Sequence, residues 1–563
     1  MTSTERIQDL LNRIYGPEKG RQVHDRLMPL IEGFDKKPGR NASRFVQGEM
    51  VLITYGDTLR HPGEKPLATF HRFARRFLKD AVSSVHFLPF FPYSSDDGFS
   101  VKDFFRIDET LGDWNDVARI GEDFKLMFDF VINHFSAESQ WFQNYLEDRP
   151  GFEHFAIEVD PAEDLSAVTR PRSLPLLTPF TKRDGRRVHL WTTFSADQID
   201  FNYASLDVLE KMVQALLFYV EKGATILRLD AIAYLWKTVG TTCIHLPQTH
   251  DMVRLFRQIL DIAAPEVMLI TETNVPHEEN ISYFGSGRDE AQMVYNFTLP
   301  PLLLYTFVKQ DATILTRWAR GLNLPSPETV FFNFTASHDG IGVRPLEGIL
   351  PAEEIDLLVK AVTANGGQVS CKDNPDGSQS PYELNITYMD AILADERSDK
   401  TDKFLASQAL QYSLPGVPAT YIHSLLGSRN WHTGVRKTGR ARSINREKLN
   451  LERVLEELDD PASFRSRVFF PYLQMIGTWR RQPAFHPQAA FEVLDAGAGL
   501  FAIRRTGGGQ TIHAVTNVSA RPVTLDIERL RITRSGRDLV SGNRIDSATL
   551  VLAPYRFAWL EAP

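Results

Sequence analysis

The sequence predicts an α/β protein built on a closed barrel of eight parallel strands. Eight short apolar runs alternate with longer amphipathic segments between residues 50 and 427. The runs are continuously apolar rather than alternating, which is typical of strands covered on both faces. Eight such units in one chain indicate a (β/α)8, or TIM, barrel that carries inserted subdomains and a C-terminal all-β domain.

Each apolar run is the predicted core of one barrel strand. The runs are MVLITYGD (50–57), SVHFLPFFP (84–92), KLMFDFVINH (125–134), ATILRLD (224–230), VMLITET (267–273), MVYNF (293–297), TVFFNFTASHD (329–339) and GVPATYIHSLLG (416–427). The carboxyl ends of barrel strands open onto one common mouth, so polar residues at these ends are candidates for a binding or catalytic site.

Two parts of the chain are predicted to flank the barrel, which itself covers 49–134 and 206–486. Residues 1–48 form a helical extension, because Ile7, Leu10, Leu11 and Ile14 make a one-sided apolar stripe. Residues 487–563 form a small β domain, because short β-like segments there are separated by Gly and Asn turns.

Two further segments are predicted to interrupt the barrel. Residues 135–205 are rich in Pro, Thr and Arg and too long for one crossover, so we expect an inserted subdomain. Residues 345–400 contain the turn-rich stretch NPDGSQSPY and are expected to form a second insertion.

Composition excludes several classes of protein. The 63 Lys+Arg and 71 Asp+Glu residues give a net charge of −8 without basic clusters, so nucleic acid is not an expected partner. No apolar run reaches the ~20 residues of a membrane helix, and the first residues lack a secretory signal, so we expect a cytoplasmic protein without membrane contact. Two cysteines are too few for a disulfide framework.

Three predicted strand ends carry a carboxylate: Asp230, Glu272 and Asp339. A single such residue more often caps the following helix. Three together suit glycoside chemistry, in which one carboxylate attacks or acts as base and another donates a proton. Arg228 lies two residues before Asp230 and therefore points to the same side of the strand, where a fixed cation keeps a carboxylate ionised.

The motifs LRLDAIAY, TET and SHDG, preceded by DFVINH, resemble the alpha-amylase superfamily of glycoside hydrolases. The stretches RLDAIAYLWKTVGTTCIHLPQTH, LPFFPYSSDDGFS, VTRPRSLPLLTPF and FTLPPLLLYTF are similar to its sucrose phosphorylase subfamily. SSDDGFSV, PHEENISYFGSG and NPDGSQSPYELNITYMDA resemble the glucosylglycerate phosphorylases within it. The resemblance covers essentially everything from Met50 to the C-terminal domain.

This resemblance implies a retaining double displacement. Asp230 matches the nucleophile that forms a β-glucosyl-enzyme, Glu272 the general acid/base, and Asp339 the residue that stabilises the transition state. The positions that match glucose-binding residues are Asp96, Phe99, His134, Phe194, Arg228, His338 and Arg446, with Phe99 and Phe194 forming an aromatic platform. By composition alone each Phe suits a core, since the chain has 37 of them, and His338 alone suits a hydrogen-bonded core imidazole.

The acceptor side must admit anions. Arg172 in TRPRSLP matches the family's phosphate-contacting arginine, although its sequence position alone favours a solvated surface charge. Tyr382 matches a tyrosine on the mobile acceptor loop, and Glu383 is its neighbour. A glycerate leaving group would also need a cation, for which Lys237, Arg170, Arg344 and Lys372 are candidates. Arg344 follows SHDGIGV, where typical sucrose phosphorylases are less basic.

The resemblance implies reversible phosphorolysis of 2-O-α-D-glucosyl-D-glycerate to α-D-glucose 1-phosphate and D-glycerate. The same chemistry on sucrose, sucrose 6-phosphate or glucosylglycerol stays open, as does a plain α-glucoside hydrolase or transglucosidase. A non-catalytic relative is disfavoured because all three carboxylates are present. No metal and no organic cofactor is expected, inorganic phosphate serves as co-substrate, and family analogy allows a homodimer.

Overall fold

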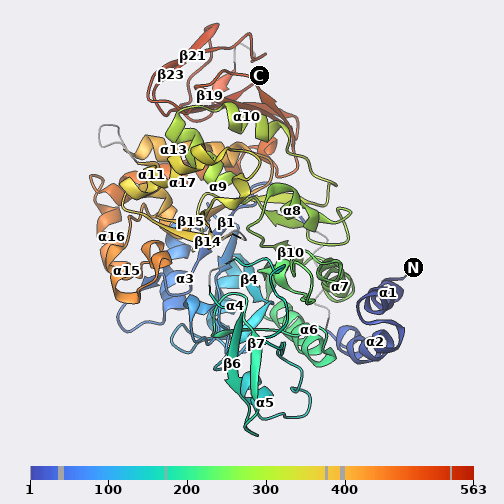
Figure 1. Ribbon diagram of the computed structural model, residues 1–563. Coiled ribbons are helices and arrows are strands. Elements are labelled where there is room, and N and C mark those ends of the chain that lie inside the picture. The colour runs from blue at the N-terminus through green and yellow to red at the C-terminus, as the bar shows by residue number, and fades with distance from the viewer. Residues whose placement is uncertain are drawn as a thin grey trace.

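The computed structural model describes residues 2–35, 44–171, 174–374, 378–393, 400–532 and 536–562. At its centre eight parallel strands close into a barrel in sequence order (Figure 1). They are β1 (Val51–Thr54), β3 (Ser84–Phe87), β4 (Lys125–Val131), β9 (Ala224–Asp230), β10 (Met268–Thr271), β11 (Met293–Tyr295), β12 (Val330–Asn333) and β16 (Val417–Tyr421). Each falls within one of the predicted runs, so the predicted fold class is confirmed.

The barrel strands are buried on both faces, which explains their continuous apolarity. All residues of β1, β3, β10 and β12 are buried. Helices follow the barrel strands along the chain and lie outside the barrel (Figure 1). The longer ones are α3 (Pro66–Phe77), α4 (Trp114–Asp123), α6 (Leu206–Glu221), α7 (Pro247–Ala263), α9 (Leu299–Lys309), α10 (Thr313–Arg320), α11 (Ala352–Ala364), α13 (Lys400–Ser413), α16 (Leu451–Asp459) and α17 (Phe464–Arg480). No helix in the described ranges combines the length and apolar character needed to cross a bilayer.

A long excursion leaves the barrel after β4 and returns before α6. It contains α5 (Gln140–Leu146) and the hairpin of β6 (Leu177–Thr181) and β7 (Arg187–Trp191). Its two ends pair as antiparallel strands, β5 (His134–Ser136) and β8 (Gln198–Asp200). This pairing brings both ends of the excursion to the mouth of the barrel.

A second excursion follows β12 and forms a three-stranded antiparallel sheet. Its strands are β13 (Ile341–Gly342), β14 (Gln368–Asp373) and β15 (Gln379–Asn385), with β15 in the middle. Gly342 lies opposite Glu383 in this sheet. The sheet therefore holds Tyr382 and Glu383 close to the segment that carries Asp339.

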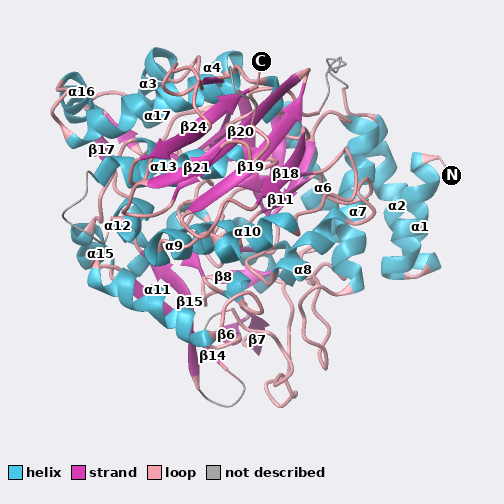
Figure 2. Ribbon diagram, turned by 90° about the horizontal axis from the view of Figure 1, so that it is seen from above, coloured by secondary structure: helices cyan, strands magenta, loops and turns pink. Residues whose placement is uncertain are grey.

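The N-terminus forms a helical hairpin of α1 (Ser3–Tyr15) and α2 (Pro17–Glu32), which packs on α6 and α7 of the barrel (Figures 1 and 2). The apolar stripe of α1, from Ile7 to Ile14, is buried in this contact. Thr2 and Glu5 begin α1 with reciprocal side-chain to backbone hydrogen bonds, a capping box.

The C-terminal part is all β, as predicted. One sheet orders its strands as β18 (Ala490–Leu494), β19 (Leu500–Gly507), β20 (Gln510–Asn517), β24 (Phe557–Glu561) and β22 (Arg537–Asp538), and β21 (Val523–Asp526) pairs with β23 (Thr549–Leu552). Arg505 of β19 is fully buried and joins this sheet to the barrel helices. Its guanidinium donates to the carbonyl oxygens of Ser413 (2.9 Å) and His486 (2.8 Å). Burial lowers the pKa of Arg505 to about 9.

We predict that Arg505→Ala lowers the free energy of unfolding by about 2–4 kcal/mol, because it removes two charge-assisted hydrogen bonds and leaves a cavity. Denaturant unfolding measures this loss. Arg504→Ala is the matched control, since Arg504 lies one residue earlier, pairs with Glu492 and is 33% exposed, so its loss should stay within about 0.5 kcal/mol. Equal losses in the two variants would contradict the anchoring role of Arg505.

Candidate active site

A cavity of about 790 Å³ lies at the carboxyl ends of the barrel strands. Asp230 ends β9, and Glu272 follows β10 directly. The predicted site residues that line the cavity are Asp96, Phe99, His134, Phe194, Arg228, Asp230, Glu272, His338, Asp339, Tyr382 and Glu383. Strand ends that are distant in the sequence thus place the three carboxylates around one space.

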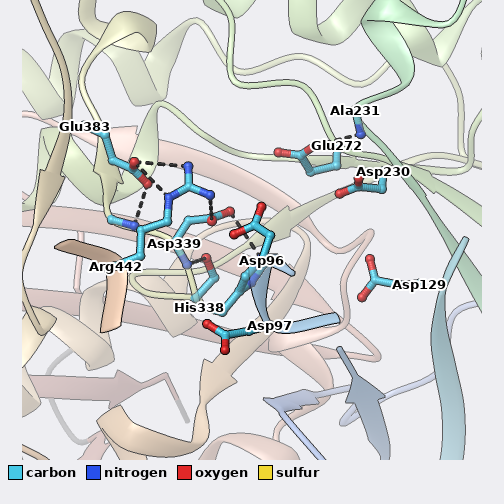
Figure 3. A network of polar contacts seen from close by, with 12 residues as sticks. Asp96, Asp97, Asp129, Asp230, Ala231, Glu272, His338, Asp339, Glu383 and Arg442 are labelled. Carbon is cyan, nitrogen blue, oxygen red and sulfur yellow. Dashed lines mark hydrogen bonds and ion pairs between the residues drawn. The ribbon is translucent and has the colours of Figure 1, made fainter. Parts of the chain in front are cut away.

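Arg228 is the centre of the carboxylate cluster. Its guanidinium donates to Asp230 at 2.7 Å and to Asp129, and it lies 3.8 Å from Glu272. The backbone N–H of Ala231 donates to the Oε2 atom of Glu272 at 3.0 Å (Figure 3). Ala231 has the left-handed φ of 51°, which turns this amide toward the neighbouring strand. Arg228 therefore holds Asp230, and the Ala231 amide holds Glu272, so that the two carboxyl groups lie side by side.

The two carboxyl groups share a buried, negatively charged environment. Burial raises the pKa of Glu272, and the charge of Asp339 raises it further. Burial and the charge of Glu272 also raise the pKa of Asp230, whereas the Arg228 guanidinium opposes this shift. Such a pair binds one proton over a broad pH range. Because Arg228 bonds directly to Asp230, we assign the proton to Glu272 and the negative charge to Asp230.

Asp339 has the opposite environment. Arg442 lies 2.8 Å and Arg446 3.5 Å from its Oδ1 atom. Although burial alone would raise it, these guanidinium groups and His338 hold the pKa of Asp339 far below its usual range. Burial lowers the pKa of His338 to about 3, so the imidazole is neutral. Asp339 is therefore a permanent negative charge on the cavity wall.

Aromatic rings form part of the cavity wall beside the carboxylates. The Phe99 ring stacks on His338 with 4.7 Å between ring centroids. The ring centroid of Phe194 lies 5.4 Å from that of His134 and 5.6 Å from that of Tyr234. Nε2 of His134 is 2.8 Å from the Phe99 carbonyl oxygen, and burial lowers the pKa of His134 to about 4. A sugar ring in the cavity would meet apolar faces and polar groups together.

Arg446 is buried and does not line this cavity, but it contacts Asp339, which does. Its guanidinium is 2.6 Å from Asp97 and 3.9 Å from Asp96. Asp96 and Asp97 both have left-handed φ values, 53° and 50°. Arg446 lines a second, outer cavity of about 1090 Å³, whose walls also include Asp96, Gln198, Tyr382, Glu383 and Arg442. The two cavities thus share part of their walls.

Arg442 joins Asp339 to Glu383 of the inserted sheet. It contacts Asp339 and also donates from Nε to Glu383 at 3.0 Å (Figure 3). The other carboxylate oxygen of Glu383 accepts the Gly340 N–H at 2.7 Å. Glu383 is therefore an anchor for Arg442 and the backbone, and its position brings Tyr382 to the cavity. Arg172, predicted to contact phosphate, lies outside the described residues.

One predicted acceptor contact, Lys237, is engaged in the interior. Its side chain is buried, and its ammonium is 2.6 Å from Asp200 and 2.7 Å from the amide oxygen of Asn133. It is not among the residues that line the cavity. A charge that is already paired in the interior cannot receive a ligand without losing its partners, which disfavours a direct contact between Lys237 and the acceptor.

The other candidate cations are also engaged. Arg344 lies 3.9 Å from Glu279, and its charge acts on the pKa of Tyr234, a cavity-lining residue. Lys372 is 2.9 Å from Glu347. Arg170 donates to the carbonyl oxygen of Leu174.

Sequence reasoning missed four residues of the site: Asp129, Gln198, Tyr234 and Arg442. Asp129 is fully buried and bonds to Arg228 and, at 2.8 Å, to His86. A charged residue inside the apolar run KLMFDFV was a usable signal for it, because buried charges need partners. Arg442 lies one helical turn before Arg446, and no local pattern distinguishes it from a surface arginine. In the described ranges, no group of three His, Cys, Asp or Glu side chains is arranged to hold a metal ion.

Comparisons with known proteins agree with this geometry. The family described as Alpha amylase, catalytic domain, matches residues 77–323. The barrel and its carboxylate site thus define a chain of the α-amylase class.

Relatives that match nearly the full length of this chain define its family more narrowly. The glucosylglycerate phosphorylase of Spirochaeta thermophila is 50% identical over 92% of this chain and 90% of its own length, and that of Escherichia coli is 46% identical over 99% and 100%. The chain belongs to the family of these glucosylglycerate phosphorylases. The crystal structure of sucrose 6F-phosphate phosphorylase from Thermoanaerobacter thermosaccharolyticum superposes with a TM-score of 0.74 at 26% identity, covering 84% of this chain and 94% of that one.

We predict that Arg442→Ala lowers kcat/KM for a glucoside substrate by about 10- to 100-fold, because Asp339 and Glu383 both lose a charge-assisted partner. Steady-state kinetics on folded protein measures the effect. Arg440→Ala is the control, since Arg440 lines only the outer cavity, and it should retain most of the activity. An unchanged kcat/KM in Arg442→Ala would show that Arg442 does not organise the site.

Proposed function

We propose that this chain is a glucosylglycerate phosphorylase, which converts 2-O-α-D-glucosyl-D-glycerate and inorganic phosphate to α-D-glucose 1-phosphate and D-glycerate, reversibly. The observation that carries the proposal is 50% identity to a glucosylglycerate phosphorylase over 92% of this chain. By comparison, this chain is 26% identical to the sucrose 6F-phosphate phosphorylase. The adjacent carboxyl groups of Asp230 and Glu272 support the nucleophilic attack and the proton transfer that this reaction requires.

The first half-reaction transfers the glucosyl group to the enzyme. The Asp230 carboxylate forms a bond to the anomeric carbon while the bond from that carbon to the glycerate oxygen breaks. Glu272 gives its proton to that oxygen, so glycerate leaves with a neutral hydroxyl group. Asp339, held ionised by Arg442, stabilises the positive charge that develops on the sugar ring.

The second half-reaction transfers the glucosyl group to phosphate. A phosphate oxygen forms a bond to the anomeric carbon, the ester bond to Asp230 breaks, and the proton of the attacking phosphate passes to Glu272. Two inversions give net retention and α-glucose 1-phosphate. This cycle needs inorganic phosphate as co-substrate and neither a metal nor an organic cofactor.

The anions of the reaction need cations at the outer side of the cavity. Arg442 is the guanidinium that the described residues provide on the wall shared by both cavities, beside Tyr382. Arg172 remains our proposed phosphate contact, and Arg344, through Tyr234, our proposed contributor to a positive acceptor site. A cytoplasmic location belongs to the proposal, since phosphate and glucose 1-phosphate are intracellular metabolites.

A product and acceptor assay tests the proposed function. With glucosylglycerate, we expect glucose 1-phosphate to form only when phosphate is present. With glucose 1-phosphate as donor, D-glycerate should be a better acceptor than fructose, fructose 6-phosphate or glycerol by at least about tenfold. Preference for fructose would identify a sucrose phosphorylase, and equal glucose release without phosphate would identify a hydrolase. Asp230→Asn should be inactive in every arm.

Glu272→Ala tests the proton transfer. We expect it to lose turnover of glucosylglycerate by at least about 10³-fold but to keep fluoride release from α-glucosyl fluoride, since fluoride leaves without a proton. In the wild type, the raised pKa of Glu272 keeps the acid protonated above the usual carboxyl range, so kcat/KM for glucosylglycerate should fall as pH rises through that pKa. The same alkaline fall should be absent with α-glucosyl fluoride. Loss of both activities in Glu272→Ala would contradict the role.

A further inference from the structure

The N-terminal helical hairpin reaches two loops that carry walls of the sugar cavity. Its contact residue is Tyr15, the last residue of α1. The Tyr15 hydroxyl donates a hydrogen bond to the carbonyl oxygen of Tyr203 at 2.8 Å. Its ring meets Trp236 edge-on, with 6.1 Å between ring centroids. Tyr203 follows β8 and Trp236 lies in the loop after β9, so one side chain touches both loops.

Each contact lies a short distance from the cavity wall. Trp236 is two residues from Tyr234, which lines the cavity. The hydroxyl of Tyr203 donates to the carbonyl oxygen of Ile132 at 2.9 Å, and Ile132 is two residues from cavity-lining His134. A shift of Tyr15 would therefore change the support of two wall residues that approach the sugar from different strands.

The buried Lys237 binds these loops to each other. It follows Trp236, and its ammonium is 2.6 Å from Asp200 of β8 and 2.7 Å from Asn133, next to His134. Its side chain is 2% exposed, so the cross-link is shielded from water and screened little by salt. The two loops therefore form one unit, with Tyr15 packed against it.

The rest of the hairpin is docked without Tyr15. The apolar stripe of α1 packs on α7, and Arg26 of α2 lies 2.6 Å from Asp207 and 2.5 Å from Glu210 on α6. These contacts dock the hairpin on the barrel independently of the Tyr15 side chain. Burial strongly raises the pKa of Tyr15, so its hydroxyl remains a neutral donor. The contact of Tyr15 with the loops is therefore separable from docking.

We propose that Tyr15 is a positioning residue for the sugar site: it holds the loops after β8 and β9, which support His134 and Tyr234, so that these two residues close the cavity against water. Tyr15 does not line the cavity, so it acts through Trp236 and Tyr203. Loss of this support would let water compete with phosphate for the glucosyl-enzyme. The effect on phosphate use rests on the proposed phosphorylase function.

The test is the partition of the glucosyl group between water and phosphate. With donor and phosphate at fixed concentrations, the ratio of free glucose to glucose 1-phosphate is measured for the wild type, Tyr15→Phe and Tyr15→Ala. We expect the ratio to rise about 2- to 5-fold in Tyr15→Phe, which loses only the hydrogen bond, and about 5- to 20-fold in Tyr15→Ala. The ratio counts products per turnover, so it does not depend on the fraction of folded enzyme.

Arg26→Gln is the matched control. It weakens the contact of α2 with α6, and so the docking of the same hairpin, without touching either loop. Its partition ratio should equal that of the wild type, even if its melting temperature falls. An unchanged ratio in Tyr15→Ala, or an equal rise in Arg26→Gln, would overturn the positioning role. If the wild type made no glucose 1-phosphate, the proposed function would fail instead. The role of Tyr15 would then be decided by KM for α-glucosyl fluoride, which should rise at least threefold in Tyr15→Ala and stay constant in Arg26→Gln.

Discussion

A single buried guanidinium organises the chemistry of this barrel. Arg228 is 2% exposed and faces Asp129, Asp230 and Glu272. Three carboxyl groups around one cation carry more negative charge than it can neutralise, so the cluster retains a proton. Arg228 lies closer to Asp230 (2.7 Å) than to Glu272 (3.8 Å), which favours the charged form of Asp230 and leaves the proton on Glu272. Removal of Arg228 would thus remove the main electrostatic difference between the two carboxyl groups.

A second guanidinium connects the barrel to its inserted sheet. Arg442 contacts Asp339 on the barrel side and Glu383 on β15, and Glu383 in turn accepts a bond from the Gly340 amide. The barrel end of the cavity and the inserted sheet are therefore joined through side-chain contacts. This closed set of contacts explains why a carboxylate lies beside a site that must admit anions: its charge is already compensated by Arg442.

The strands and the three carboxylates could be predicted from the sequence because their signals are local. A continuous apolar run that ends in Asp or Glu is visible within ten residues, as in ATILRLD. The roles of Glu383 and Lys237 could not be predicted, since each depends on a partner far along the chain, Arg442 or Asp200. A lysine near a predicted mouth has the same local sequence whether it faces a ligand or an interior carboxylate. Only the fold distinguishes the two.

The short pairing of β5 with β8 has a consequence for how this architecture diversifies. It closes the excursion at its base, where the Ala137 N–H donates to the Asp197 carbonyl oxygen at 2.9 Å. The hairpin of β6 and β7 beyond that base can be lengthened, shortened or exchanged while His134, Phe194 and Gln198 keep their places in the cavity wall. Natural variation in acceptor preference, or a chimaera built in the laboratory, can therefore be confined to a replaceable hairpin above a retained cavity wall.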